Sequence, residues 1–290
     1  MDEKQYAGCR ENIDHTPEDF PYNVYLCTIP LDFRSVQTHW HDEMEIIVIK
    51  KGEGIVAVDL TAYEVHAGDL VFVCSGQLHS ISQKDACTME YENILFRPSL
   101  LRTAGFDMCS ERLLQPLCTG KIRPVPLVTA GSSAHAAFSA LIGQMDKLCD
   151  ARPHAYQLAV KGLLFQIMFL LLSECSQLPV PKTDRKSLDK VKTVLSYVEE
   201  HYQEPITIEE IAAQCYYSKS YFMRFFKETM GTGFIQFLND YRLEIAAKLL
   251  LSGDGTVLDA AMQSGFENLS YFTRSFKKKY GVTPGKYRKE

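Results

Sequence analysis

The sequence predicts an α+β protein of several domains, in which an N-terminal β-barrel of the jelly-roll type precedes a helical part. Three observations lead to this fold class. Short β-branched runs separated by turn residues fill residues 20–97. After Pro98, apolar residues recur instead at three- and four-residue steps, which is the period of a helix. A segment of the C-terminal third also returns after 50 residues, which indicates a duplicated helical unit.

The composition is that of a soluble globular protein of about two domains. The chain has 290 residues, of which 46% are hydrophobic and 23% charged, with a net charge of −5. The N-terminus lacks the apolar segment of a signal peptide, and the longest apolar run, residues 162–172, is far shorter than the ~20 residues that cross a bilayer. The nine cysteines are odd in number and form no C-x-x-C pair, so we expect reduced thiols. The chain is therefore expected to be cytoplasmic, with no membrane partner.

The first predicted strands lie in the N-terminal part of the chain. Residues 45–49 form a β-branched run that residues 50–52 end, and residues 54–59 form another run. Residues 67–69 are a turn before the apolar residues 70–73. Short strands at this spacing are typical of a β-sandwich or β-barrel.

Two amphipathic helices and a linker are expected in residues 126–186. Apolar side chains line one face of residues 132–150 and one face of residues 154–177, and Pro153 separates the two segments. The linker, residues 178–186, has two prolines and no hydrophobic periodicity. The helices either pack within their own chain or form the seam of a homodimer. Both interpretations remain open, and we expect a homodimer.

Charge is divided unevenly along the chain. Residues 185–290 contain 16 Lys and Arg against 13 Asp and Glu, a net charge of +3, whereas residues 1–184 have a net charge of −8. Such asymmetry between the two parts indicates an anionic partner for the C-terminal domain.

The internal repeat predicts two helix-turn-helix units. Residues 220–227, Ser-Tyr-Phe-Met-Arg-Phe-Phe-Lys, return as Ser-Tyr-Phe-Thr-Arg-Ser-Phe-Lys at residues 270–277. Capping boxes at Thr207 and Thr256 begin the first helix of each copy, and Gly265 supplies the turn of the second copy. The second helix of such a unit is the one that enters the DNA major groove.

The spacing of side chains divides each second helix into two faces. Phe222 and Phe226 are four residues apart and face the core, as do Phe272 and Phe276. The other faces present side chains that suit DNA, since arginine reads guanine edges, and serine, threonine and lysine reach bases or phosphates. They are Ser220, Met223, Arg224, Lys227, Ser270, Thr273, Arg274 and Lys277. The alternative, a helical protein-interaction module with solvated basic residues, fits a duplicated basic face less well.

The C-terminal hundred residues resemble the AraC/XylS family of bacterial transcription regulators. The resemblance implies two helix-turn-helix units joined by a long helix over residues 233–251, with both second helices in successive major grooves. It also implies base contacts from Ser220, Met223 and Arg224, and from Leu269, Ser270, Thr273 and Arg274. One departure is Ala260, where the family usually has isoleucine. The segments that carry the resemblance are residues 208–212, 218–227, 231, 241–250, 265–266, 270–277 and 281–288.

A cluster of histidines in the N-terminal domain has the pattern His39-x-His41-x3-Glu45, with His79 farther along. Residues two apart in a strand share a face, so His39 and His41 are expected to converge. The pattern resembles the two halves of the cupin signature, and in metal-binding cupins these four positions hold the ion. The departures from that signature are Cys74 in place of proline, Gln83 in place of asparagine and Phe33 in place of the opening glycine.

Two interpretations of this cluster remain open. In one, the cupin-like domain binds a divalent first-row metal at His39, His41, Glu45 and His79, and acts as a metal-dependent sensor or enzyme. In the other, which we favour, the cluster is a remnant of the fold, no cofactor is required, and the barrel binds a small organic effector such as a sugar. Tyr22 and Tyr25 precede the first expected strand, where an arm folds over the pocket in the family, and they can line a sugar site.

Taken together, the sequence predicts a non-enzymatic, cytoplasmic transcription regulator. Residues 1–125 are the expected effector-sensing barrel, residues 126–186 the connecting and dimerisation segment, and residues 187–290 the DNA-binding domain. The expected partners are a double-stranded DNA operator, a small-molecule effector, a second copy of the chain and RNA polymerase. The resemblance also implies activation, because members of this family usually activate transcription, and we expect the same of this chain.

Overall fold

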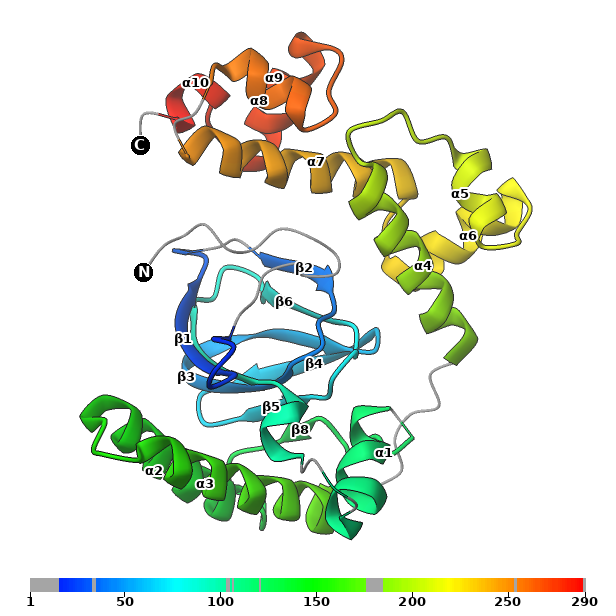
Figure 1. The fold of residues 1–290 in the computed structure, drawn as a ribbon. Helices are drawn as coiled ribbons and strands as arrows, with labels where there is room; N and C mark the ends of the chain where they lie inside the picture. Colours follow the sequence, from blue (N-terminus) through cyan, green and yellow to red (C-terminus); the bar gives the residue numbers. More distant parts are fainter. Residues whose placement is uncertain are drawn as a thin grey trace. The chain divides into compact units, whose positions relative to one another are not determined.

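The computed structural model describes residues 16–32, 35–102, 105, 107–119, 121–175, 185–252 and 255–288 (Figure 1). Contacts within the chain divide it into two compact units, residues 12–183 and residues 184–290, which we call the barrel unit and the helical unit. The two helices assigned from the sequence to a connecting segment belong to the barrel unit. Most of the expected linker lies outside the described residues.

The barrel unit is built on an antiparallel sheet of eight strands within the described residues. Its main path runs in the order β1-β7-β3-β5-β8; β4 and β6 pair with β3, and β2 pairs with β6. The strands are β1 (Tyr22–Ile29), β2 (Ser35–His39), β3 (Met44–Val58), β4 (Thr61–His66), β5 (Leu70–Val73), β6 (His79–Gln83), β7 (Met89–Phe96) and β8 (Leu127–Val128).

The long strand β3 corrects one sequence prediction. Residues 45–49 and 54–59 were expected to be separate strands, but they lie almost wholly within one strand. Its first half pairs with β5 and β7, and its second half pairs with β4 and β6, with a register shift between Ile49 and Lys51. Gly52 has a φ of +75°, and a Cβ there would collide with the carbonyl oxygen of Thr88. A bulge beside a glycine thus bends the strand instead of ending it, and the sheet curls around its own interior.

Helices cover one face of the sheet. The principal pair is α2 (His135–Ala151) and α3 (Tyr156–Leu170), and α3 continues as a π-helical turn, η3 (Leu171–Cys175). Figure 1 shows this pair beneath β5 and β8. Three shorter segments precede them: η1 (Pro98–Leu101), η2 (Ser110–Leu114) and α1 (Gln115–Cys118). The two predicted amphipathic helices are therefore present, with Pro153 in the connection between them.

The barrel unit has two apolar layers. One lies between the sheet and the helices, where the rings of Phe72 and Phe138 are 4.9 Å apart. The other fills the inside of the curled sheet. Neighbouring residues of β3 serve different layers, because Ile46 faces the helices whereas Ile47 faces the interior of the sheet.

The segment Tyr156–Cys175 is long and apolar enough to cross a membrane by length and composition alone, with a mean hydropathy of 1.7. One face of this helix, which includes Val160, Leu164 and Ile167, is fully buried against the sheet and α2. A core helix of a soluble protein meets the same criterion, and 39% of the apolar window of this helix is buried.

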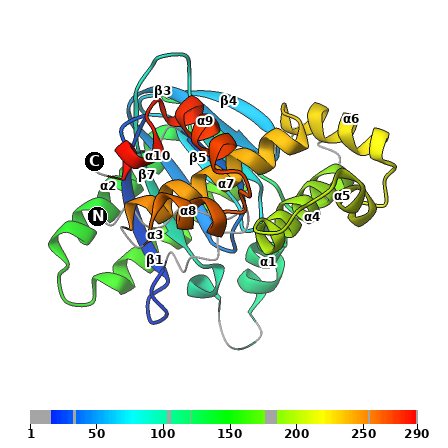
Figure 2. The ribbon, with the colours of Figure 1, turned by 90° about the horizontal axis from the view of Figure 1, so that it is seen from above.

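The helical unit contains seven helices within the described residues, and the longest of them, α7, connects its two halves. Figures 1 and 2 show α5 and α6 at one end of α7, and α8, α9 and α10 at the other. The predicted fold class, an N-terminal β domain followed by a C-terminal all-α domain, is confirmed. The helices are α4 (Arg185–His201), α5 (Ile208–Gln214), α6 (Lys219–Met230), α7 (Phe234–Leu251), α8 (Val257–Gln263), α9 (Leu269–Tyr280) and α10 (Pro284–Tyr287).

The structure explains why these residues form a duplicated unit. Thr207 and Thr256 both form complete capping boxes, with the hydroxyl accepting from the third residue of the helix and the carboxylate of that residue accepting from the cap. Each turn needs a left-handed residue, Tyr216 in the first copy and Gly265 in the second. The helices α6 and α9 then start at Ser218 and Asn268, whose side chains accept from the backbone of the first turn.

Candidate functional site

The first candidate site is the exposed surface of α6 and α9. On the inner faces, Phe222 and Phe226 are fully buried, and so are Phe272 and Phe276. The faces are therefore divided as the spacing of the phenylalanines predicts. On the outer faces Thr273 is half-buried and donates its hydroxyl to the backbone, and the other predicted DNA-contacting side chains are exposed. They are Ser220, Met223, Arg224, Lys227, Leu269, Ser270, Arg274 and Lys277.

The cations of this surface are available to an external anion. The guanidinium of Arg224 lies 5.4 Å from the centre of the Tyr221 ring, which holds it against its own helix. Within the part of the chain that the structure describes, Lys227, Arg274 and Lys277 make no hydrogen bond or ion pair. Two separate helices thus each present an arginine and a lysine on the side opposite a buried phenylalanine pair.

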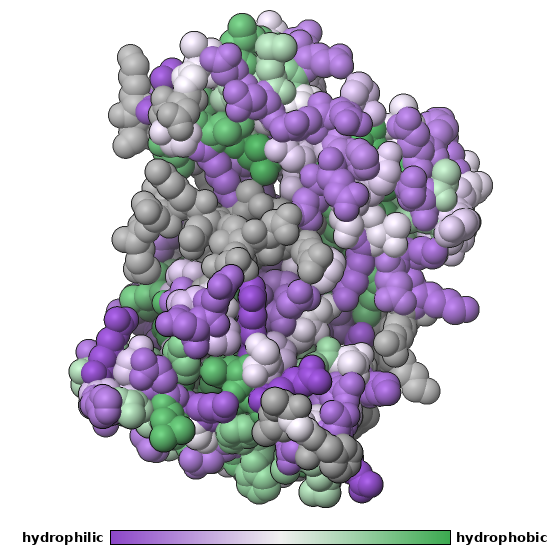
Figure 3. Space-filling model, viewed as in Figure 1, coloured by the Kyte–Doolittle hydropathy of each residue, from purple (hydrophilic) through white to green (hydrophobic). Residues whose placement is uncertain are grey.

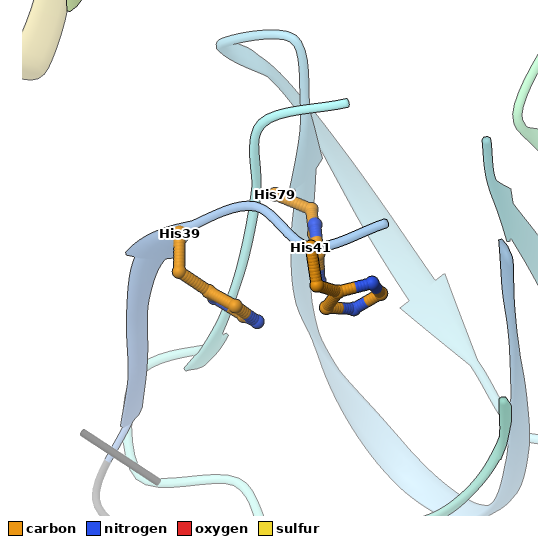
Figure 4. A group of neighbouring side chains, drawn as sticks. All are labelled: His39, His41 and His79. Atoms are coloured by element: carbon orange, nitrogen blue, oxygen red, sulfur yellow. The ribbon is translucent and has the colours of Figure 1, made fainter. Parts of the chain in front are cut away.

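The second candidate site is the histidine cluster, which the structure brings together from three parts of the sheet (Figure 4). His39 ends β2, His79 begins β6, and Glu45 lies in β3. The ligand nitrogens of His39, His41 and His79 lie within 4.8 Å of one another, and all four side chains are buried. The carboxylate oxygen Oε2 of Glu45 lies 2.9 Å from Nε2 of His79 and 3.3 Å from Nε2 of His41.

Backbone contacts fix the orientation of all three imidazole rings. The Nδ1 atoms of His39, His41 and His79 lie 2.8, 3.1 and 3.0 Å from carbonyl oxygens of the chain. A carbonyl oxygen only accepts, so each Nδ1 carries the proton and donates it. In a neutral ring the lone pair is then on the Nε2 atom, and in His41 that atom lies 3.3 Å from Oε2 of Glu45.

This arrangement places lone pairs of nitrogen against an acidic oxygen. The Nε2 of His79 has no hydrogen-bond partner among the described residues, despite its 2.9 Å distance from Glu45. Burial raises the pKa of Glu45, but positive charge and hydrogen bonds from the facing His79 and His41 together outweigh burial and hold that pKa well below its usual range. The carboxylate is therefore charged, and its balancing positive charge comes from protons on the facing imidazoles or, in their place, from a bound cation.

The cluster fits a divalent first-row metal ion by its donor chemistry. Imidazole nitrogens and a carboxylate are ligands that such ions accept, and the carbonyl contacts of the three Nδ1 atoms are the kind of support that metal-bound histidines have. His39, His41, Glu45 and His79 would hold the ion, which would supply the balancing positive charge. The orphaned Nε2 of His79 is the observation on which this fit depends.

The two tyrosines predicted to line an effector site lie in different apolar layers. Both are within β1 and do not precede it, which corrects the expectation of an arm before the first strand. Tyr22 is buried in the layer between sheet and helices, where its hydroxyl lies 3.6 Å from Sγ of Cys149. Tyr25 packs at the edge of the other layer, and its hydroxyl accepts from Asn23. The two residues were placed before the strand because the residue at which a strand begins is weakly marked in a sequence.

One residue beside the cluster was missed from the sequence. Glu43 is buried, its backbone oxygen holds His41, and its side chain forms an ion pair with Arg97 at 3.0 Å. Through its backbone oxygen, Glu43 positions the ring of His41. The sequence feature that could have identified Glu43 is an acidic residue two positions from a histidine in a buried run.

Two helix-turn-helix units on a shared helix are the architecture of a regulator that binds DNA through both. A helix-turn-helix domain model matches residues 206–290, and an AraC-like ligand binding domain model matches residues 23–168. The chain belongs to the AraC family of transcriptional regulators and is a DNA-binding regulator with a ligand-binding domain.

Similar proteins include several bacterial regulators. The chain is 25% identical over 281 residues to the uncharacterized HTH-type transcriptional regulator YdeC of Bacillus subtilis, covering 97% of this chain and 96% of that protein. It is 35% identical over 101 residues to the regulatory protein PocR of Salmonella typhimurium, covering 35% of this chain and 33% of that protein. Among solved structures, ToxT from Vibrio cholerae covers 92% of this chain and 98% of that chain, with 14% identity and a TM-score of 0.46.

Proposed function

We propose that this regulator is a homodimeric, effector-controlled transcription activator of the cytoplasm, without enzymatic activity, that reads its operator with the outer faces of α6 and α9. The observation that carries the proposal is the duplicated exposed face, in which an arginine and a lysine stand opposite a buried phenylalanine pair on each helix. Arginine forks recognise guanine in the major groove, while lysines contact phosphates and add salt-dependent affinity.

The test is DNA binding by variants of the two arginines. A duplex selected from a random library by the full-length protein serves as the probe. Arg224→Ala or Arg274→Ala should each lose roughly 1–3 kcal/mol of discrimination at particular base pairs. The matched control is Lys286→Ala, which removes an exposed cation of the same unit outside the two helices and should keep the sequence preference. Unchanged preference in both arginine variants would contradict the assignment.

The exposed face of α3 supports dimerisation. One row of apolar residues runs along α3 and into η3 at alternating steps of four and three residues, the spacing of a two-helix seam. Its members are the exposed Leu158, Gly162, Phe165 and Phe169, and the half-buried Leu172 of η3. Leu158 is 74% exposed, and Phe169 is 68% exposed. Figure 3 shows hydrophobic side chains gathered on the surface where α2 and α3 lie. An apolar stripe without charged residues is the surface that a second copy of the same helix covers in a symmetric dimer.

Dimerisation and effector binding would act together on transcription. Two copies place two helical units on adjacent operator sites, and tethering them raises the effective affinity. An effector bound in the barrel unit changes activity only if it binds one arrangement of the dimer more tightly than another. Contact with RNA polymerase completes the proposed activation. An operator-reporter assay in a bacterial host distinguishes activation from repression. Deletion of the regulator should lower reporter output if the protein is an activator, and would raise it if the protein is a repressor.

A second candidate for the effector is a divalent metal ion, and a specific observation favours it. Three buried imidazoles keep Nδ1 on a backbone carbonyl, and two of them, His41 and His79, direct Nε2 toward the Glu45 carboxylate. The competing candidate is a small organic effector, such as a sugar, bound in a metal-free barrel.

Calorimetric titration of chelator-treated protein with Zn²⁺ separates the two candidates. If the cluster binds metal, the wild-type protein should take up about one ion per chain, and at 100 times its Kd the ion should stabilise the fold by about 2.7 kcal/mol. His79→Ala should lose this binding. The matched control is His66→Ala, an exposed histidine outside the cluster. Absence of Zn²⁺ binding, together with a sugar that raises the melting temperature of chelator-treated protein, would establish the metal-free sensor.

A further inference from the structure

Three segments of the helical unit that are far apart in sequence meet at one point, which we call the joint. They are the loop at residues 202–204, Arg242 in the middle of α7, and Gly265 in the turn between α8 and α9. The loop follows α4 and leads into the first helix-turn-helix unit, whereas Gly265 belongs to the second. The joint is therefore a direct contact between the two halves of the DNA-binding domain.

Arg242 joins α7 to the end of α4. Its Nε donates to the carbonyl oxygen of Tyr202, and its Nη2 donates to that of Glu204, both at 2.7 Å. Both carbonyl oxygens belong to the loop after α4, outside the hydrogen bonds of the helix, and need another donor. A guanidinium fork satisfies both acceptors at once, which a lysine cannot do in this geometry. The ring of Tyr202 also packs edge-on to that of Tyr241, at 5.5 Å.

Gly265 brings the second unit against the same loop. Its φ is +86°, and a Cβ there would collide with the carbonyl oxygen of Tyr202 and lie 2.9 Å from Nε of Arg242. The equivalent turn residue of the first unit is Tyr216, which is also left-handed but 89% exposed. A helix-turn-helix turn therefore does not itself need a glycine, and the glycine is needed for the close approach at the joint.

The remaining contacts attach each recognition helix to α7 separately. Phe226 of α6 packs against Phe234 at 5.5 Å between ring centres. On the other side, Phe272 of α9 packs in one apolar cluster with Ala246 and Leu250 of the C-terminal half of α7. These two attachments lie toward different ends of α7, so bending between them is resisted where the two units contact each other.

We infer that Arg242 and Gly265 are positioning residues that fix the separation of α6 and α9, and with it the number of base pairs that the protein accepts between its two contact sites. This inference rests on the proposed mode of DNA reading. One added base pair moves the second site by about 3.4 Å along the DNA axis and by roughly a tenth of a turn around it. A stiff pair of helices cannot follow that movement, whereas a loosened pair can.

The experiment compares duplexes that differ only in spacing. The probe is a duplex selected by the full-length wild-type protein, and a second duplex has one base pair inserted between the two segments that footprinting shows to be contacted. Fluorescence anisotropy at fixed salt gives both dissociation constants. The insertion should weaken wild-type binding by about tenfold or more, the cost of one lost base contact. Arg242→Ala and Gly265→Ala should weaken binding to the original duplex but reduce the insertion penalty to less than about threefold.

Two further variants keep the test decisive. Gly231→Ala has the same left-handed strain, with φ of +70° and open space around the Cβ, so it should keep the wild-type penalty. Arg242→Lys retains charge and stem, and it replaces the alanine variant if circular dichroism shows that Arg242→Ala is unfolded. If the folded variants at Arg242 and Gly265 lose as much affinity on insertion of the base pair as the wild-type protein does, this inference is wrong and the proposed function is unaffected. A wild-type protein that selects no preferred sequence overturns the proposed function and this inference together.

Discussion

Phe169 offers a quantitative test of the proposed dimer. The side chain is 68% exposed in the single chain and lies on the apolar stripe of α3. Full burial of a phenylalanine is worth about 1.5–3 kcal/mol, so covering the exposed part would supply about 1–2 kcal/mol per chain. A twofold seam contains two copies, and truncation to alanine should cost the dimer roughly 2–4 kcal/mol, or about 30- to 700-fold in its Kd.

Sedimentation equilibrium of the full-length protein over a range of concentrations measures this Kd directly. At concentrations where the protein is monomeric, Phe169→Ala should have the same melting temperature of the barrel unit as the wild-type protein, because the ring contributes little to the core of one chain. Phe138→Ala removes a fully buried ring and should instead lower stability by about 3–5 kcal/mol. Leu113→Ala, a truncation of an exposed apolar residue outside α3, should leave the dimer unchanged. A wild-type protein that stays monomeric at micromolar concentration, or an unchanged Kd in Phe169→Ala, would refute the reasoning.

Three further predictions concern stability. Thr207→Ala removes a reciprocal cap and should lower the unfolding free energy of the helical unit by about 1 kcal/mol, measured by chemical denaturation. Gly52→Ala should lower the melting temperature of the barrel unit by more than Gly143→Ala, because the Cβ at position 52 would meet the Thr88 carbonyl at a positive φ whereas that at position 143 meets nothing; calorimetry measures both. Burial raises the pKa of Glu244, and the ammonium of Lys279 at 2.8 Å opposes that rise. In Lys279→Met the folded state should therefore bind a proton more readily than the unfolded state, so the loss of stability should be smaller at pH 5 than at pH 7 in urea titrations.

Much of the fold follows from local sequence signals. Capping boxes at Thr207 and Thr256, and phenylalanines four residues apart, set the helices of the duplicated unit and their inward faces. Such signals act within a few residues, so they are readable without knowing the rest of the chain. The continuity of β3 was not readable in this way, because a bulge beside Gly52 looks like the end of a strand until the partner strands are known.

The candidate site shows the same limit. Strand alternation predicted that His39 and His41 would converge, and the cupin resemblance added Glu45 and His79. The hydrogen bonds that orient the three rings could not be predicted, since they depend on the backbone carbonyls of Gln37, Glu43 and Gln77. Tyr22 was expected before the first strand, but it lies within β1 and packs in the layer between the sheet and the helices.

The unequal turns of the two helix-turn-helix units have a consequence for protein engineering. Glycine can replace Tyr216 in the turn of the first unit, because the tyrosine side chain is almost wholly exposed. The reverse exchange, which would put a tyrosine at Gly265, leaves no room for even the first carbon of the side chain. Grafting between the two copies therefore works in one direction only, and a chimaera or an extended array must keep the second turn where another unit lies against it.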